Sequence, residues 1–165
     1  MINIAICDDE KIFLEEVFEV VSNLLKENEI KFEIDSFISG EDLLKEIESG
    51  NTRYDIVFLD IIMANDDGIE VGKKIKEIDE KIYILYISSS KEFLLDGYDV
   101  GAFNYILKPI DENRLKSQIF KLLEKIRKNE EILEINKAGM IIKLKIEWIY
   151  VNILDTKIRT ILSCS

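Results

Sequence analysis

Histidine is absent from this 165-residue sequence, which also has only one proline, seven glycines and two cysteines. Without histidine, the chain has no imidazole metal ligand, no Ser-His catalytic pair and no residue that becomes phosphohistidine. Any phosphoryl donor must therefore be a separate molecule. Because hydrophobic residues make up 47% of the chain and proline and glycine are few, the composition predicts a folded protein rather than a disordered one.

Long hydrophobic runs are absent too. No apolar run approaches the roughly 18 residues that a membrane-spanning helix requires, and the first run stops at Asp8, too early for a signal peptide. Cys7 falls in a predicted core strand and Cys164 in the last residues, so a disulfide between them is not expected. Reduced thiols and the lack of a membrane segment favour a cytoplasmic protein.

Basic residues are outnumbered: 22 Lys and Arg against 33 Asp and Glu give a formal net charge of -11. The whole excess lies in residues 1–129, because residues 130–165 carry five acidic and five basic residues. Neither part has the basic footprint of a nucleic-acid interface. The length suits one domain of common size with a remainder of roughly 35 residues.

The stretch from Tyr54 to Gly68 contains the first candidate reactive group. Ile56 to Leu59 is an apolar run without polar alternation, which is typical of a parallel strand that is covered on both faces. Asp60 follows this run directly. In open α/β sheets ligands bind at the carboxyl ends of the strands, so Asp60 is either a reactive group or an ordinary polar residue that opens a loop.

Three other apolar runs also end in polar groups: Ile2–Cys7 before Asp8-Asp9, Ile82–Ile87 before Ser88, and Ala102–Leu107 before Lys108-Pro109. Adjacent carboxylates repel one another unless a cation lies among them. Magnesium, which prefers oxygen ligands and is often held by one or two carboxylates, is the obvious candidate. The hydroxyl of Ser88 and the ammonium group of Lys108 are suited to contact a phosphoryl group.

Amphipathic segments separate these runs and predict the fold. A further strand is expected at Glu29–Ile38, and helices are expected at Glu10–Asn28, from a cap at Ser39 to Gly50, from Asp66 or Asp67 to about Lys81, at Lys91–Asp99, and from a cap at Asp111 onward. Side chains expected to face the sheet are Leu14, Val17, Phe18, Val21 and Leu25 in the first helix, and Val71, Ile75 and Ile78 in the third.

The alternation of five strands with five helices predicts an α/β fold with a doubly wound, five-stranded parallel sheet in the flavodoxin-like order 2-1-3-4-5. In that order, the strands that end at Cys7 and Leu59 are neighbours. The carboxylates of Asp8, Asp9 and Asp60 are therefore expected to converge at one edge of the sheet.

Taken together, Asp8-Asp9, Asp60, Ser88, Tyr105 and Lys108-Pro109 resemble the signature of the receiver domain of two-component response regulators, across residues 1–128. The resemblance implies that a sensor histidine kinase phosphorylates Asp60. It also implies roles for the neighbouring groups: magnesium is held by Asp8, Asp9, Asp60 and the carbonyl group of Ile62, the phosphoryl group is contacted by Ser88 and Lys108, and Tyr105 reports the state to an output surface.

One position departs from that family's pattern. The family commonly has Met-Pro soon after the phosphorylated aspartate, whereas this chain has Met63-Ala64. We expect alanine to leave the loop backbone less restricted without removing a reactive group.

The output side of the predicted site has two interpretations. Phe93 to Tyr98 form more apolar surface than a short helix needs for one core face, so the segment is either ordinary core or a partner surface. Likewise, Tyr105 is either a static core aromatic or a switch that turns inward when Ser88 moves toward a phosphoryl group.

Residues 129–165 predict an antiparallel β segment, with apolar or alternating runs at Ile132–Ile135, Met140–Ile146, Trp148–Leu154 and Ile158–Leu162. The segment is similar to the opening strands of the LytTR-type DNA-binding family, whose domain is roughly three times longer. The resemblance implies transcription regulation, with DNA binding only where the domain is complete. Unpaired strand edges in a partial domain favour a homodimer or aggregation.

Three alternatives remain open at this stage. A haloacid-dehalogenase-like phosphatase also uses a strand-end aspartate, magnesium, a hydroxyl and a lysine, but that class has Asp-x-Asp where this chain has Asp8-Asp9-Glu10. A flavin-binding flavodoxin needs a hydroxyl-rich phosphate loop at the same place, and these three acids would repel a phosphate. A stand-alone receiver without DNA output also fits. The leading interpretation is a phospho-accepting switch rather than an enzyme, with chemistry limited to its own phosphorylation and dephosphorylation.

Overall fold

The computed structural model describes residues 1–93, 101–130, 132–137 and 140–145, and its chain divides into two compact units, Met1–Ile119 and Phe120–Ser165. The first unit contains the sheet and the candidate site. None of the helices in the described ranges is both long enough and apolar enough to span a membrane.

Five parallel strands form the central sheet: β1 (Ile2–Cys7), β2 (Phe32–Phe37), β3 (Ile56–Leu59), β4 (Tyr83–Ser88) and β5 (Asn104–Leu107). Their order is β2-β1-β3-β4-β5, which confirms the predicted topology. Every residue of β3 is buried, whereas β2, at the sheet edge, has exposed and half-buried residues only. The unbroken apolar run of β3 thus reflects cover on both faces.

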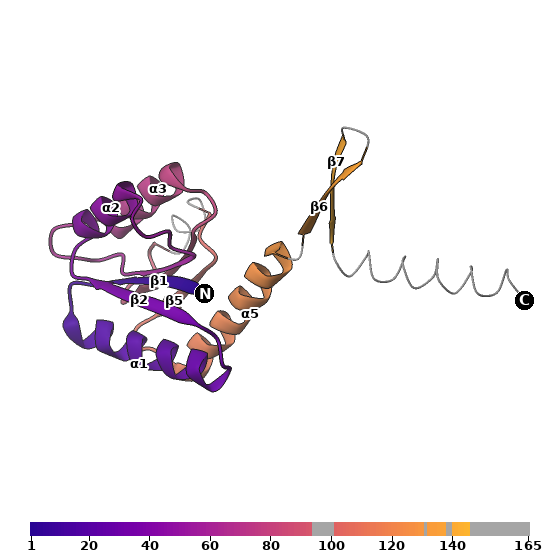
Figure 1. Ribbon diagram of the computed structural model, residues 1–165. Coiled ribbons are helices and arrows are strands. Elements are labelled where there is room, and N and C mark those ends of the chain that lie inside the picture. Colours follow the sequence, from indigo (N-terminus) through magenta and orange to yellow (C-terminus); the bar gives the residue numbers. More distant parts are fainter. Residues whose placement is uncertain (94–100, 131, 138–139, 146–165) are drawn as a thin grey trace, which may run out of the picture. The chain divides into compact units, whose positions relative to one another are not determined.

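The helices of the first unit are α1 (Lys11–Glu27), α2 (Gly40–Ser49), α3 (Gly68–Ile78) and the beginning of α5 (Glu112–Glu130). Figure 1 shows α1 against one face of the sheet and α2 and α3 against the other. The expected caps form: Ser39 Oγ accepts from the Asp42 N–H at 3.2 Å, Asp67 accepts from Ile69 N at 2.9 Å, and Asp111 accepts from Arg114 N at 2.9 Å. Gly50 ends α2 with a φ of 68°, which glycine adopts without strain.

The expected helix at Lys91–Asp99 falls mostly on residues 94–100, which lie outside the described residues. Phe93, at the start of that segment, is partly buried and packs against the core cluster.

A hydrophobic core cluster lies between the sheet and the α2–α3 layer. It combines strand residues with inward side chains of the two helices, among them Leu43, Ile47, Val71 and Ile75. This packing fixes the helices, and therefore the loops that precede them, against the carboxyl edge of the sheet.

Two predicted core residues are more exposed than expected. Phe18 in α1 is 43% exposed because it lies toward β2, the edge strand, where Lys11, Leu14, Glu15 and Ser36 line a shallow surface hollow with it. Ile78 is 43% exposed because it is the last residue of α3, where the helix ends. Leu24, which the predicted stripe omitted, is buried instead.

In the second unit, β6 (Ile132–Lys137) and β7 (Met140–Lys145) pair antiparallel, with Ile132 opposite Lys145 and Lys137 opposite Met140. The strands predicted at Trp148–Leu154 and Ile158–Leu162 lie outside the described residues. The division into domains at residues 128 and 129 stays a prediction.

Candidate functional site

Three carboxylates meet at the carboxyl edge of the sheet. Cys7 and Leu59 are partners in the β1–β3 register, and the backbone N–H of Asp60 donates to the Cys7 carbonyl at 2.9 Å. Asp8, Asp9 and Asp60 each present an oxygen atom, and these atoms all lie within 4.8 Å of one another. Asp8 and Asp60 are only 4% and 3% exposed, whereas Asp9 is exposed. The three acids therefore converge as the strand order predicted.

Gly68 explains how the loop after β3 comes so close to Asp60. A Cβ atom at Gly68 would collide with the carbonyl oxygen of Asp60, and it would lie 2.6 Å from the Cα atom of Ile61. The N–H of Gly68 donates to the Ile61 carbonyl at 2.9 Å, and the N–H of Ile61 donates to Asp60 Oδ1 at 2.8 Å. The close approach, which only glycine permits, thus helps to hold the Asp60 carboxylate in place.

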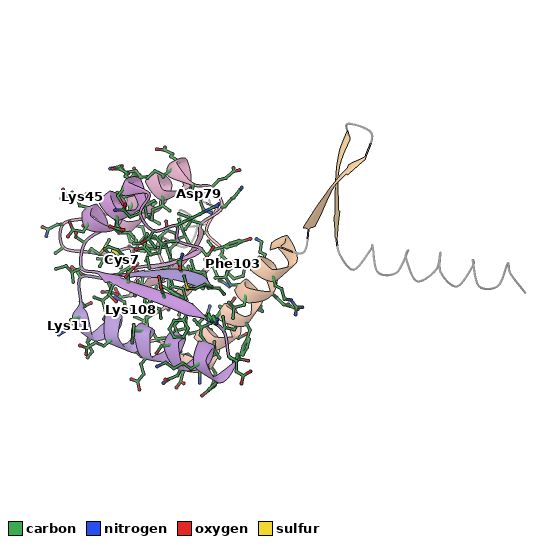
Figure 2. All side chains as sticks on the ribbon, in the orientation of Figure 1. Cys7, Lys11, Lys45, Asp79, Phe103 and Lys108 are labelled. Carbon is green, nitrogen blue, oxygen red and sulfur yellow. The ribbon has the colours of Figure 1, made fainter. Side chains whose placement is uncertain are left out.

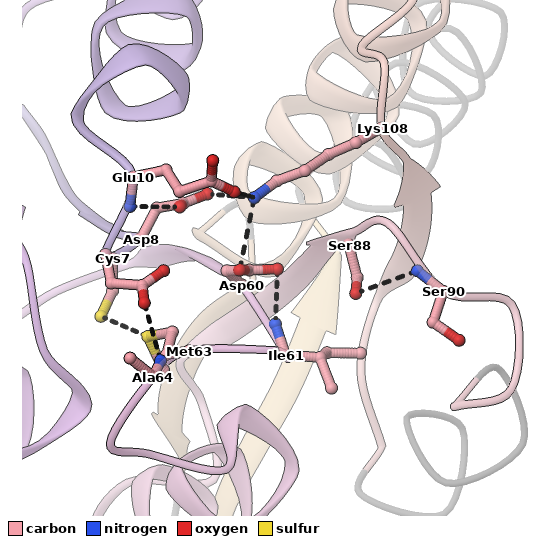
Figure 3. Close-up of polar contacts among 11 residues, drawn as sticks. Cys7, Asp8, Glu10, Asp60, Ile61, Met63, Ala64, Ser88, Ser90 and Lys108 are labelled. Atoms are coloured by element: carbon pink, nitrogen blue, oxygen red, sulfur yellow. Dashed lines mark hydrogen bonds and ion pairs between the residues drawn. The ribbon is translucent and has the colours of Figure 1, made fainter.

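Lys108, from the end of β5, supplies the positive charge at the site (Figure 3). Its ammonium group lies 2.7 Å from Asp8 Oδ2, 3.3 Å from Asp60 Oδ2 and 3.9 Å from Glu10 Oε1. It also lies 3.9 Å from the ring centroid of Phe13, a cation–π contact. The lysine side chain is 5% exposed, so its stem and charge are both enclosed; Figure 2 contrasts Lys108 with Lys11 and Lys45 at the surface.

The electrostatic environment of the site disfavours the charged form of Asp60. Burial raises the pKa of Asp60 to about 6; Lys108 opposes this shift, and the neighbouring charge of Asp8 adds to it. One ammonium group does not neutralise three carboxylates. Binding of a further cation or a proton at this cluster would therefore reduce the repulsion among the carboxylates and stabilise the folded protein.

The donor set fits a hard divalent cation. All three converging ligands are carboxylate oxygens, which Mg²⁺ prefers, and they carry more negative charge than Lys108 compensates. The backbone carbonyl of Ile62 is the expected fourth ligand. Ile62 forms an isolated bridge with Asp67, and the hydrogen bond from Gly68 at this bridge uses the carbonyl of Ile61 rather than that of Ile62. The bridge therefore does not occupy the expected ligand atom.

Hydroxyl groups lie on the β4–β5 side of the cluster. Leu59 pairs with Tyr86, so Ser88 follows one residue beyond the level of Asp60 on the neighbouring strand, and its side chain is buried. Ser88 Oγ accepts from Ser90 N at 3.5 Å, and the hydroxyl of Tyr105 donates to the Ser90 carbonyl. Burial raises the pKa of Tyr105, and a hydrogen bond with the Ser88 side chain opposes that shift. Ser88 thus lies on the strand beside Asp60 and close to Tyr105, which is itself buried at 7% exposure.

Several contacts at the site escaped the sequence analysis. Phe13 and Glu10 contact Lys108, and only the approach of α1 to the end of β5 brings them there. The N–H of Ala64 donates to Asp9 Oδ2 at 2.7 Å. Alanine, unlike proline, therefore supplies a polar contact here, while the expected loosening of the loop stays a prediction. The departure at Met63-Ala64 was the sequence signal that pointed to this position.

Cys7 lies directly beneath the carboxylates but is not a reactive thiol. Burial, reinforced by the surrounding aspartates, raises its pKa far above the ordinary value, and its Sγ atom lies 3.8 Å from Met63 Sδ. The two sulfur atoms pack against each other below the carboxylates.

Comparison with known proteins identifies the family of this fold and site. The model of the response regulator receiver domain matches residues 4–120. Sensory transduction protein LytT of Bacillus cereus is 33% identical over 131 residues, which are 79% of this chain and 49% of that protein. Transcriptional regulatory protein YpdB of Escherichia coli K12 is 32% identical over 119 residues, 72% of this chain and 46% of that protein. The chain spans about half the length of these curated relatives.

A third relative extends into the tail: LytT of Bacillus anthracis is 28% identical over 174 aligned residues that include 96% of this chain and 68% of that protein. Among solved structures, the response regulatory domain of MrkE from Klebsiella pneumoniae has a TM-score of 0.68 and 28% identity, covering 76% of this chain and 98% of that one. The BeF3-activated DrrB receiver domain has a TM-score of 0.64 and 27% identity, covering 75% and 98%.

Proposed function

Since the chain belongs to the response regulator receiver domain family, we propose that Asp60 accepts a phosphoryl group from the histidine of a sensor kinase. The single observation that carries this assignment is the convergence of Asp8, Asp9 and Asp60 beside Lys108 at the carboxyl edge of the sheet. The family match also sets aside the phosphatase and flavin-binding alternatives.

In the proposed reaction, a carboxylate oxygen of Asp60 attacks the phosphorus atom as the bond to the kinase histidine breaks. Asp60 becomes an acyl phosphate, and the released imidazole takes a proton from solvent. Asp8, Asp9, Asp60 and the carbonyl of Ile62 would hold magnesium, and the bound ion would neutralise charge on the phosphoryl oxygens.

The residues of the chain perform the positioning. Ile61 N–H orients the Asp60 carboxylate at 2.8 Å. Lys108 is close enough to turn from Asp60 to a phosphoryl oxygen, because its ammonium group lies 3.3 Å from Asp60 Oδ2. Ser88, buried at the end of the adjacent strand, donates a hydrogen bond to a second oxygen and passes the change to Tyr105.

The test is phosphorylation by a small phosphodonor in the presence of magnesium, followed by intact mass measurement. We expect wild type to gain the mass of one phosphoryl group and Asp60→Asn to gain none. Asp55→Asn, a change at the opposite end of β3, is the matched control and should behave as wild type. A full mass gain in Asp60→Asn would refute the assignment of Asp60.

We also propose that residues 129–165 begin a LytTR-type DNA-binding domain, and that a protein of the relatives' full length regulates transcription. Two observations support this: the alignment with the longer LytT of Bacillus anthracis extends through the tail, and β6 and β7 pair antiparallel. Residues 130–165 have no net charge, so the chain as given should not bind DNA selectively. A sequence-selective shift of a DNA probe by these 165 residues at physiological salt would contradict that expectation.

A further inference from the structure

Each carboxylate of the cluster accepts a hydrogen bond from one backbone N–H. The donors are Glu10 to Asp8 at 3.0 Å, Ile61 to Asp60 at 2.8 Å, and Ala64 to Asp9 at 2.7 Å. The first two donors are one or two residues from the acid they bind. Ala64, by contrast, is 55 residues away from Asp9 in the sequence. The contact between Asp9 and Ala64 therefore joins two separate loops.

Asp9 depends on this contact more than the other two acids depend on theirs. Lys108 lies within 3.3 Å of both Asp8 and Asp60, and both are buried. Asp9 is exposed, and among the described residues its only polar contact is the hydrogen bond from Ala64. Without that donor, the Asp9 side chain would turn freely in solvent.

Ala64 is itself held firmly by its surroundings. The preceding residue, Met63, is buried and packs against Cys7 through a 3.8 Å sulfur contact. On the other side, Asp66 Oδ2 accepts from the N–H of Gly40 at 2.9 Å, which ties the loop to the beginning of α2. The N–H of Ala64 is thus a fixed donor in a loop that is fastened at both ends; Figure 3 shows the end at which Met63 meets Cys7.

We propose that the backbone N–H of Ala64 is a positioning group for the divalent cation. It holds Asp9 Oδ2 and so aims the Asp9 carboxylate at Asp8 and Asp60, which makes the exposed acid a preorganised ligand. Cation affinity then depends on a backbone N–H at position 64. This inference rests on the magnesium site of the proposed function.

The experiment compares Mg²⁺ binding by isothermal titration calorimetry in wild type, Ala64→Pro and Ala64→Ser. Proline removes the N–H without changing any charge. Serine keeps the N–H, and the exposed position of Ala64 leaves room for its hydroxyl group. We expect Ala64→Pro to weaken Mg²⁺ binding about tenfold, the low end of the effect of removing a hydrogen-bond partner from a metal ligand. Ala64→Ser should bind as wild type does.

A double-mutant cycle separates positioning from a general disturbance of the loop. In an Asp9→Ala background, Ala64→Pro should cause little further loss, because the side-chain oxygen that the N–H positions has gone. Circular dichroism checks that each variant folds. If Ala64→Pro fails to fold, the Ala64 amide proton is followed by NMR instead: Asp9→Ala should shift its resonance upfield, and an unchanged resonance would contradict the hydrogen bond.

The outcomes distinguish this inference from the function on which it rests. If wild type binds no Mg²⁺, the proposed magnesium site fails and the inference fails with it. If wild type binds but Ala64→Pro binds equally well or more tightly, the positioning role alone is wrong.

Discussion

The carboxyl edge of the sheet has two halves that differ in what holds them together. The acidic half contains Asp8, Asp9 and Asp60, and within the described part of the chain its one close ammonium group is that of Lys108, which lies within 3.3 Å of two of them. The hydroxyl half contains Ser88, Ser90 and Tyr105, which are uncharged and hydrogen-bond to one another. The acidic half is therefore short of positive charge, whereas the hydroxyl half satisfies its own polar groups.

The difference indicates that the two halves respond to different events. Adding a cation or a proton relieves repulsion in the acidic half, so that half responds to charge. The hydroxyl half has no such imbalance, and it responds when a new hydrogen-bond acceptor draws Ser88 away from its present partners. Mutations should therefore affect charge-dependent stability in the first half and signal transmission in the second.

The largest expected effect comes from removing the positive charge of the acidic half. Lys108→Ala leaves Asp8 and Asp60 buried without their ammonium partner, which should lower the free energy of unfolding by about 3 kcal/mol at pH 8 in a chelator. Magnesium should still bind and restore part of the loss, while the response to a phosphoryl mimic weakens. Urea denaturation with and without Mg²⁺ measures the loss of stability and its partial restoration by magnesium.

Lys45→Ala is the matched control for that experiment, since Lys45 forms ion pairs at the surface with Glu41 and Asp42. Its effect should be much smaller and should not depend on magnesium. Equal losses of unfolding free energy in the two variants would show that the ion pairs of the enclosed Lys108 stabilise the protein no more than those of the exposed Lys45.

A second prediction concerns the pH dependence of stability without metal. Because the folded pKa of Asp60 is about 6, raised from 3.8, the folded state binds this proton more tightly than the unfolded state, and stability falls as pH rises between about 4 and 6. Asp60→Asn removes the buried charge and should stabilise the metal-free protein by roughly 2 to 3 kcal/mol at pH 8, with little effect at pH 4.

Thermal or urea unfolding of wild type and Asp60→Asn across that pH range, in a chelator, checks the sign of the pH dependence. A difference that is constant with pH would mean that Asp60 titrates at an ordinary pKa in the folded state. It would also remove the main contrast between the two halves, because ionisation of Asp60 in the acidic half would then not destabilise the folded state.

Much of the site was predictable because parallel strands bring their ends together. Once Ile2–Cys7 and Ile56–Leu59 were identified as neighbouring strands, the convergence of Asp8 and Asp60 followed from topology. The caps at Ser39 and Asp67 were predictable for a local reason, since each bonds a backbone group two or three residues away.

The contacts that the sequence did not predict join segments far apart in the chain. Phe13 under Lys108 and Ala64 beside Asp9 depend on how α1 and the β3–α3 loop lie over the sheet, and no local pattern encodes that. The error at Phe18 has a related cause: helical spacing indicates the apolar face of α1, but how much of that face the sheet covers depends on where the sheet ends.

The last prediction tests the hydroxyl half and has the smallest effect on stability. Ser88→Ala removes one hydroxyl whose present partners are Ser90 and Tyr105, so the free energy of unfolding should fall by about 1 kcal/mol or less. Asp60 should still accept a phosphoryl group, because its carboxylate is oriented by Ile61 and Lys108 instead. What should be lost is the transmitted response, since without the Ser88 hydroxyl a phosphoryl oxygen has no route to Tyr105. Sedimentation of wild type, Ser88→Ala and the exposed control Ser89→Ala, each with and without beryllium fluoride and Mg²⁺, measures the change in self-association. Wild type and Ser89→Ala should shift together while Ser88→Ala does not, and identical shifts in all three proteins would exclude Ser88 as the coupling residue.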